Sequence, residues 1–128
     1  MRVYAMKPFR RFQRKEGLKD DALCEAIRRA ERWLVDAKLG RGLIKQRAAR
    51  RGQGRSGGFR VIVAYRPSAR AVFLYGFAKN EKDNIADDEL AALRQIAADL
   101  LGARHDRLQA MIADDQLTEL NYGEEKKG

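Results

Sequence analysis

The chain has 128 residues and a mass of 14.6 kDa, and 45% of its residues are hydrophobic and 35% are charged. This length predicts a single domain with a core of its own. No run approaches the ~18 apolar residues that a membrane-spanning helix requires. The N-terminal segment lacks the apolar stretch of a secretory signal. A lone cysteine, Cys24, cannot form a disulfide framework or a zinc site. The composition therefore predicts a small soluble protein of the cytoplasm.

The N-terminal third of the chain predicts a short strand followed by two helices. Residues 1–6 are typical of a strand, and Pro8 is well placed to begin a helix over residues 9–15. A longer helix is predicted from about residue 20 to residue 38. Its apolar positions recur at intervals of four, three, four and three residues, which is a helical stripe: Leu23, Ile27, Ala30, Leu34 and Ala37.

From Leu43 the apolar period changes to two, which is the pattern of strands. Strands are predicted over residues 43–48, 59–66 and 71–78, and their short connections favour an antiparallel meander. Residues 50–58 are rich in arginine and glycine and predict a flexible basic loop or ribbon between the first two strands.

The rest of the chain predicts two more helices, over residues 87–101 and 104–115. Residues 121–128 are polar and are expected to form a disordered tail after a single domain over residues 1–120. The predicted fold class is α+β. Its antiparallel sheet combines the N-terminal strand with the three-strand meander, and a helical pair precedes the meander while the C-terminal helices follow it.

Charge is distributed unevenly along the chain, which carries a net charge of +9. Residues 1–80 hold 21 Lys/Arg and 6 Asp/Glu, whereas residues 81–128 hold 6 and 12. No acidic residue occurs between Asp36 and Glu81, where eleven basic residues lie. Such a stretch repels itself unless an anionic partner neutralises it. Nucleic acid fits best, because each neutralised phosphate releases counterions. An acidic protein, a membrane surface and a solvated face without a ligand are the weaker interpretations.

The usual catalytic constellations are missing from the sequence. The single histidine, His105, stands outside the basic stretch and is expected to be structural or solvent-exposed. Cys24 lies on an amphipathic helix and is expected to be core. The glycines of residues 52–58 do not connect a strand to a helix, so they do not indicate a phosphate-binding loop. No metal-ligand cluster or cofactor motif occurs, and we expect neither a metal nor a cofactor.

Strand alternation predicts a basic patch on one side of the meander. Lys45 and Arg47 are two residues apart and point to one face of their strand. Arg60 on the second strand and the segment 79–82 after the third become their neighbours across the sheet. Of the nearby aromatic residues most are expected to be core, and Tyr75 or Phe77 is the preferred candidate for a ring at the patch.

An RNase can operate without histidine if it relies on the charges of clustered lysine and arginine. Attack by the adjacent 2′-hydroxyl needs that group deprotonated, the phosphorane charge stabilised and the leaving 5′-oxygen protonated. Cations serve the second need directly. A lysine crowded by like charges has a lowered pKa and can serve as the acid or base. DNA lacks the 2′-hydroxyl, so this chemistry is specific for RNA.

Two strings in this region resemble a known signature. They are GGFRVIVAY at residues 57–65 and YGFAKNEKDNI at residues 75–85. The chain is similar over about residues 1–102 to the RelE/ParE superfamily of toxins, in the RelE-like/HigB-like branch. The resemblance implies a small RelE-like fold and a toxin of a type II toxin–antitoxin system, with a co-expressed antitoxin as partner.

The resemblance also implies an activity and a set of residues. RelE-like and HigB-like members cleave mRNA on the ribosome and so inhibit translation, which implies contacts with mRNA and ribosomal RNA and involves no membrane or small-molecule cofactor. The family's catalytic basic residues match Lys45, Arg47, Arg60 and Lys79, with Arg60 at the scissile phosphate. The further RNA-binding residues that we expect are Arg50, Arg51, Arg55, Asn80 and Lys82.

The sequence departs from the RelE pattern at two positions. Asn80 stands where the pattern has an arginine, and Ala86 stands where it has a tyrosine. The general acid and base are therefore left unassigned. Two alternatives stay open at this point: a ParE-like toxin that inhibits gyrase by binding it, and an RNA-binding toxin homologue without catalysis.

Overall fold

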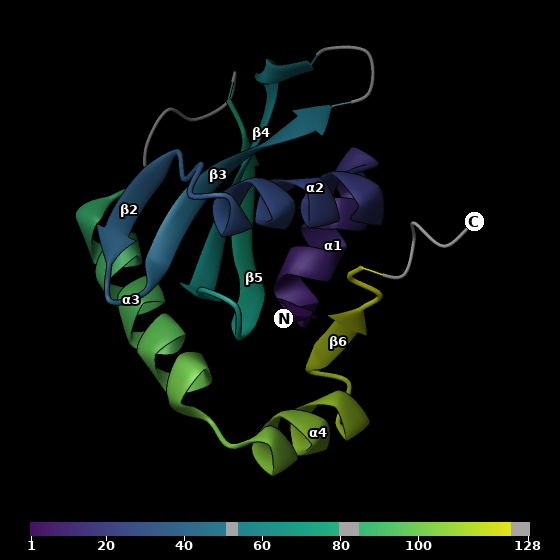
Figure 1. The fold of residues 1–128 in the computed structure, drawn as a ribbon, viewed down its shortest axis with the longest axis vertical. Helices are drawn as coiled ribbons and strands as arrows, with labels where there is room; N and C mark the ends of the chain where they lie inside the picture. The colour runs from purple at the N-terminus through teal and green to yellow at the C-terminus, as the bar shows by residue number, and fades with distance from the viewer. Residues whose placement is uncertain (51–53, 80–84, 124–128) are drawn as a thin grey trace.

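The structure of the protein is a computed structural model that describes residues 1–50, 54–79 and 85–123, without the side chains of residues 50 and 54–57. The described chain is an α+β fold in which helices cover both faces of one sheet, as Figure 1 shows. This confirms the fold class that the sequence predicts. In chain order the elements are β1 (Arg2–Met6), α1 (Lys7–Glu16), α2 (Asp20–Glu31), β2 (Ala37–Gly40), β3 (Leu43–Arg50), β4 (Gly54–Arg66), β5 (Arg70–Ala78), α3 (Asp87–Gly102), α4 (His105–Ala113) and β6 (Leu117–Leu120).

The strands lie in the order β2-β3-β4-β5-β1-β6. Strands β2 to β5 form antiparallel pairs in succession, and so do β1 and β6, whereas β1 is parallel to β5. The predicted meander and its junction with the N-terminal strand are thus present, with one parallel pair at that junction. β1 and β5 lie in the interior of the sheet, so both are shielded from solvent on two edges.

Alternation along the strands sorts the apolar side chains into two cores. Val61, Val63 and Tyr65 of β4 face a core that α1 and α2 complete. Ile62 and Ala64 of the same strand face a second core beneath α3 and α4. This is the two-residue period that the sequence predicts for strands. A register shift between Ile62 and Val63 bends the pairing of β4 with β5.

The helix α2 is shorter than the sequence predicts. The stripe over residues 20–38 predicts a helix to Lys38, but α2 ends at Glu31. Trp33 takes a left-handed conformation with φ 68°. Its N–H donates to the Ala30 carbonyl at 2.9 Å, and the Leu34 N–H donates to the Arg29 carbonyl at 2.9 Å. This is the Schellman pattern that ends helices. Leu34 is therefore outside the helix and exposed rather than in the apolar stripe.

The residues after α2 instead form a strand. β2 pairs with β3 in an antiparallel hairpin and becomes one edge of the sheet. The predicted basic loop or ribbon over residues 50–58 is also partly strand, because β3 extends to Arg50 and β4 begins at Gly54. Residues 51–53 lie outside the described chain.

The C-terminal segment completes the fold. The predicted helices appear as α3 and α4, and α4 ends at Ala113 rather than near residue 115. β6, which the sequence did not predict, then pairs with β1. Leu108, Leu117 and Leu120 from this segment are buried. Of the expected disordered tail over residues 121–128, residues 121–123 are described and Tyr122 packs against the first core, whereas residues 124–128 lie outside the described chain. Among the described residues, no helix is long and apolar enough to span a membrane.

Candidate nucleic-acid interface

The basic residues of the meander meet across strands in two rows. Arg47 of β3 lies opposite Arg60 of β4, and Arg60 lies opposite Phe77 of β5. Lys45 lies opposite Ile62, which in turn lies opposite Tyr75. Two like charges at directly opposed positions destabilise a sheet. An arginine pair in this register therefore favours the binding of an anion, and phosphate is an anion whose geometry fits a guanidinium fork.

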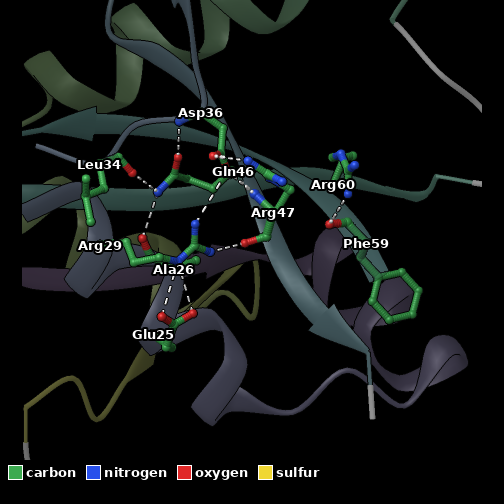
Figure 2. Close-up of polar contacts among 9 residues, drawn as sticks. All are labelled: Glu25, Ala26, Arg29, Leu34, Asp36, Gln46, Arg47, Phe59 and Arg60. Atoms are coloured by element: carbon green, nitrogen blue, oxygen red, sulfur yellow. Dashed lines mark hydrogen bonds and ion pairs between the residues drawn. The ribbon is translucent and has the colours of Figure 1, made fainter. Parts of the chain in front are cut away.

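Arg47 is held in place by a set of hydrogen bonds to its backbone and its side chain (Figure 2). Its N–H donates to Asp36 Oδ2 at 2.7 Å, and its Nη2 lies 3.3 Å from Asp36 Oδ1. The Arg47 carbonyl accepts a hydrogen bond from Arg29 Nη2. The Arg47 side chain is nevertheless 46% exposed, so its guanidinium remains accessible.

The supports beneath Arg47 are themselves buried. Arg29 is 3% exposed, and its guanidinium also contacts the carboxylates of Glu25 and Asp36. Gln46 is fully buried and accepts the Asp36 N–H at 2.7 Å. Its amide donates to the Ala26 carbonyl at 2.9 Å and to the Leu34 carbonyl at 3.2 Å (Figure 2). A fully connected polar network of this kind fixes the positions of its members.

The Asp36 carboxylate stays ionised in this network. Burial by itself would raise the pKa of Asp36, but hydrogen bonds from the Arg47 backbone and side chain, together with the charges of Arg47 and Arg29, hold it below its ordinary value. A group with a lowered pKa is a poor proton donor near neutral pH. Asp36 therefore acts as a structural anion and does not supply the missing general acid.

Arg60 differs from Arg47 in having no partner of opposite charge within ion-pair distance in the described chain. The only described hydrogen bond of its side chain is from Nη1 to the Phe59 carbonyl at 3.4 Å (Figure 2). The side chain is partly buried. Burial and the neighbouring Arg47 charge lower the pKa of Arg60, with Asp36 opposing them. The guanidinium still remains charged at neutral pH, so an anion bound here would relieve an electrostatic cost.

The two lysines flank this arginine pair. Lys45 is partly buried on the face of β3 that carries Arg47, whereas Lys79 is exposed just after β5. The Lys79 N–H donates to the Gly58 carbonyl at 3.4 Å, which places it two residues from Arg60 on the neighbouring strand. Alternation after Phe77 puts Lys79 on the Arg60 face. The structure thus brings the four predicted catalytic positions together on neighbouring strands, around residues 58–62 of β4.

The remaining sequence predictions have mixed outcomes. Phe77 is buried, so Tyr75, which is partly buried with its ring centroid 6.1 Å from that of Phe77, is the ring nearer to solvent. His105 is exposed on α4 and Cys24 is buried, as expected. The side chains of Arg50 and Arg55, and the whole of Arg51, Asn80 and Lys82, lie outside the described part of the chain. Within the described ranges no group of three potential metal ligands gathers.

Sequence reasoning missed Asp36 as a functional neighbour. It was placed inside the predicted long helix, away from the strands, and only the true end of α2 brings it beside Arg47. The signal that could have found it is its position as the last acidic residue before the basic stretch.

Comparison with protein families places this geometry in context. A family described as "RelE toxin of RelE / RelB toxin-antitoxin system" matches residues 1–120. Because the match covers most of the chain, the protein belongs to the RelE toxin family, and it is a toxin of a toxin–antitoxin system with an antitoxin as its implied partner. Among curated proteins, none matches the chain. The match extends through β6.

Proposed function

We propose that this toxin is a ribosome-dependent endoribonuclease that cleaves mRNA by attack of the 2′-hydroxyl on the adjacent phosphate, without a metal ion. The observation that carries the proposal is the Arg47–Arg60 pair, in which a partly buried guanidinium has no described counter-ion. Membership of the RelE family supports a toxin role, and the four basic residues gathered on the meander support RNA as the target.

The chemistry assigns one role to each cation. Arg60 binds the scissile phosphate, and Arg47 beside it stabilises the second negative charge that develops on the phosphorane. The 2′-oxygen forms a bond to phosphorus as its proton passes to a base, and the bond to the 5′-oxygen breaks as that oxygen gains a proton. The products are a 2′,3′-cyclic phosphate and a 5′-hydroxyl. Lys45 and Lys79 flank the site and are the residues available for proton transfer.

RNA binding outside the scissile phosphate extends the same surface. The proposal assigns Arg50, Arg51, Arg55, Asn80 and Lys82 to contacts with the mRNA or ribosomal RNA. Tyr75 offers the only partly exposed ring of the two rows and would stack on a base, a contact worth about 1–3 kcal/mol.

The test is induced expression followed by primer extension on a translated reporter mRNA. Wild-type toxin should give cuts in phase with codons. Arg60→Ala and Lys79→Ala should each reduce cutting by at least ten-fold, and the double variant should abolish it. Arg104→Ala is the matched control, because Arg104 is an exposed arginine between α3 and α4 whose side chain is 87% exposed.

Two results would contradict the proposal. Growth arrest without cuts would indicate that the target is a protein such as gyrase. Cuts that persist at full strength in the double variant would show that the active site does not lie on the meander. A ribosome-free assay on the same RNA with the purified toxin separates strict ribosome dependence from general RNase activity.

A further inference from the structure

The most exposed large apolar side chain of the described chain is Trp33, at 82% exposure. It occupies the position after α2 where the backbone is left-handed, with φ 68°. Glycine is the usual residue there, because a side chain destabilises this conformation. Neither backbone preference nor packing within the chain explains a tryptophan at this point. Such a residue is typical of an interface anchor.

The backbone on both sides of Trp33 is held by hydrogen bonds. The Schellman hydrogen bonds of Trp33 and Leu34 fix its N-terminal side. On its C-terminal side the buried Gln46 amide binds the Leu34 carbonyl and the Asp36 N–H (Figure 2). The indole is thus presented to solvent on a preorganised backbone, which lowers the entropic cost of binding a partner.

Trp33 lines a groove of about 360 Å³ formed where the end of α2, the β2–β3 hairpin and the β4–β5 turn meet. Its apolar lining includes Val35, Leu43, Tyr65 and Pro67. A neighbouring hollow shares Tyr65 and Pro67 and continues to α3. Leu34, at 54% exposure, lies next to Trp33 and extends the apolar surface.

The charges around this groove indicate what kind of partner it binds. Lys38 and Arg41 line it, Arg66 lines the adjoining hollow, and no carboxylate belongs to the described lining of either. The nearby Glu31 carboxylate is already bound by the Tyr65 hydroxyl and the Ser68 N–H. An apolar floor favours a protein over RNA, and a cationic rim favours acidic residues at its edge.

We propose that this Trp33 groove docks an acidic segment of the antitoxin that places bulky apolar side chains against the indole. The inference rests on the toxin role and names the surface that the partner uses. Tyr65 lies five residues beyond Arg60 on β4, which separates the groove from the arginine pair by about 16 Å at strand spacing. The groove and the arginine pair are therefore separate surfaces, and substitutions can separate antitoxin docking from phosphate binding.

The probe is the antitoxin itself, obtained as the fragment of the source genome that restores growth to cells expressing wild-type toxin. The toxin is prepared as Arg60→Ala to spare the host, with 5-fluorotryptophan at Trp33, the single tryptophan of the chain. Its ¹⁹F resonance should shift when antitoxin is added, and its accessibility to a soluble quencher should fall at least three-fold.

Variants then measure affinity. Trp33→Gly should weaken antitoxin binding at least ten-fold, equivalent to about 1.4 kcal/mol. Its urea midpoint should be unchanged or raised, because glycine suits the left-handed position, so loss of binding is not loss of fold. Ile96→Ser is the matched control: this α3 side chain is 38% exposed and lines neither hollow, and affinity should stay within two-fold.

Trp33→Gly in the otherwise wild-type toxin should retain codon-phased cuts, which distinguishes this inference from the proposed function. The inference is overturned if the resonance does not change on antitoxin binding, or if Trp33→Gly binds antitoxin as tightly as Ile96→Ser. It is equally overturned if Trp33→Gly loses cutting but keeps the antitoxin, since the indole would then serve the ribosome. If no fragment of the source genome restores growth to cells expressing the toxin, there is no antitoxin to dock in the groove, and the inference is also overturned.

Discussion

Arg60 combines partial burial, a like-charged cross-strand neighbour and the lack of a described counter-ion. Each feature disfavours the folded state in the absence of an anion, so stability and function should be opposed at this residue. Replacement by an apolar side chain of similar length tests this opposition. Arg60→Met should be at least as stable as the wild type, because removing a like-charge pair across a sheet relieves about 0.2–1 kcal/mol.

Inorganic phosphate should reverse this order of stability, so that the wild type becomes the more stable protein. A ligand that binds only the folded protein raises the free energy of unfolding according to its concentration and dissociation constant. Millimolar inorganic phosphate at constant ionic strength should therefore raise the melting temperature of the wild type, and should raise that of Arg60→Met less. Equal shifts in both proteins, or a destabilised Arg60→Met, would show that Arg60 is not an anion site.

Asp36 leads to a prediction about how the stability of the protein depends on pH. Its folded-state pKa lies below the ordinary value of 3.8, so its contribution to stability is fully present above that value and is lost as pH falls through the folded pKa. Asp36→Asn keeps an acceptor for the Arg47 N–H but loses the charge, which should cost about 1 kcal/mol at pH 7. Urea unfolding should show the difference from wild type shrinking as the pH falls below about 4.

The control for this prediction is Asp99→Asn. Asp99 forms an ion pair with Arg107 in which both side chains are more than half exposed, at 60% and 53%. Exposed pairs of this kind contribute little. Asp99→Asn should therefore match the wild type at every pH. A loss as large as that of Asp36→Asn would mean that the pH effect reflects net charge rather than the Arg47 network.

Among the elements, β5 carries a constraint that its sequence does not reveal. A Cβ at Gly76 would lie 2.4 Å and 2.7 Å from two ring atoms of Phe12. Phe12 packs edge-on against Phe59, with ring centroids 5.6 Å apart, so its ring has little freedom to move. Overpacking of this kind costs about 1–3 kcal/mol. Gly76→Ala should lower the free energy of unfolding by that amount in urea titrations.

Gly102 supplies the contrast for that prediction. It ends α3, and a Cβ there would meet nothing within 4 Å. Gly102→Ala should be neutral or stabilising by up to about 1 kcal/mol, because alanine is the better helix residue. If both substitutions gave the same change, the contact between α1 and β5 would not be tight.

The elements also show what the sequence could predict. β3, β4 and β5 have a clear two-residue period, so their existence, their meander and the Arg47–Arg60 neighbourhood followed from alternation. The end of α2 did not, because its left-handed position holds Trp33 and the usual signal there is glycine. β2 and β6 have four residues each, too few for a period to show. β6 also pairs with β1 from the other end of the chain, which no local pattern can indicate.

At the scale of the whole molecule, the C-terminal segment closes both the sheet and the second core. It adds β6 to the edge of β1 and buries three leucines: Leu108 at 0% and Leu117 at 2% exposure in the second core, and Leu120 at 5% in the first. A buried leucine contributes about 2–5 kcal/mol, and whole domains are stable by only about 5–15 kcal/mol. The motifs in the sequence indicate the resemblance only to about residue 102, whereas the family match and the fold both extend to residue 120.

Truncation after residue 102 and after residue 123 tests which part of the C-terminal segment the fold requires. A chain of residues 1–102 should show no cooperative unfolding in urea and should aggregate, because β1 becomes an unprotected edge next to an opened core. A chain of residues 1–123 keeps every described element and should unfold at the urea midpoint of the full chain. Circular dichroism against urea measures both, in the Arg60→Ala background. If residues 1–102 unfolded cooperatively with an unchanged midpoint, α4 and β6 would be an addition to a finished domain. If residues 1–123 lost stability, the last five residues would contribute to the fold.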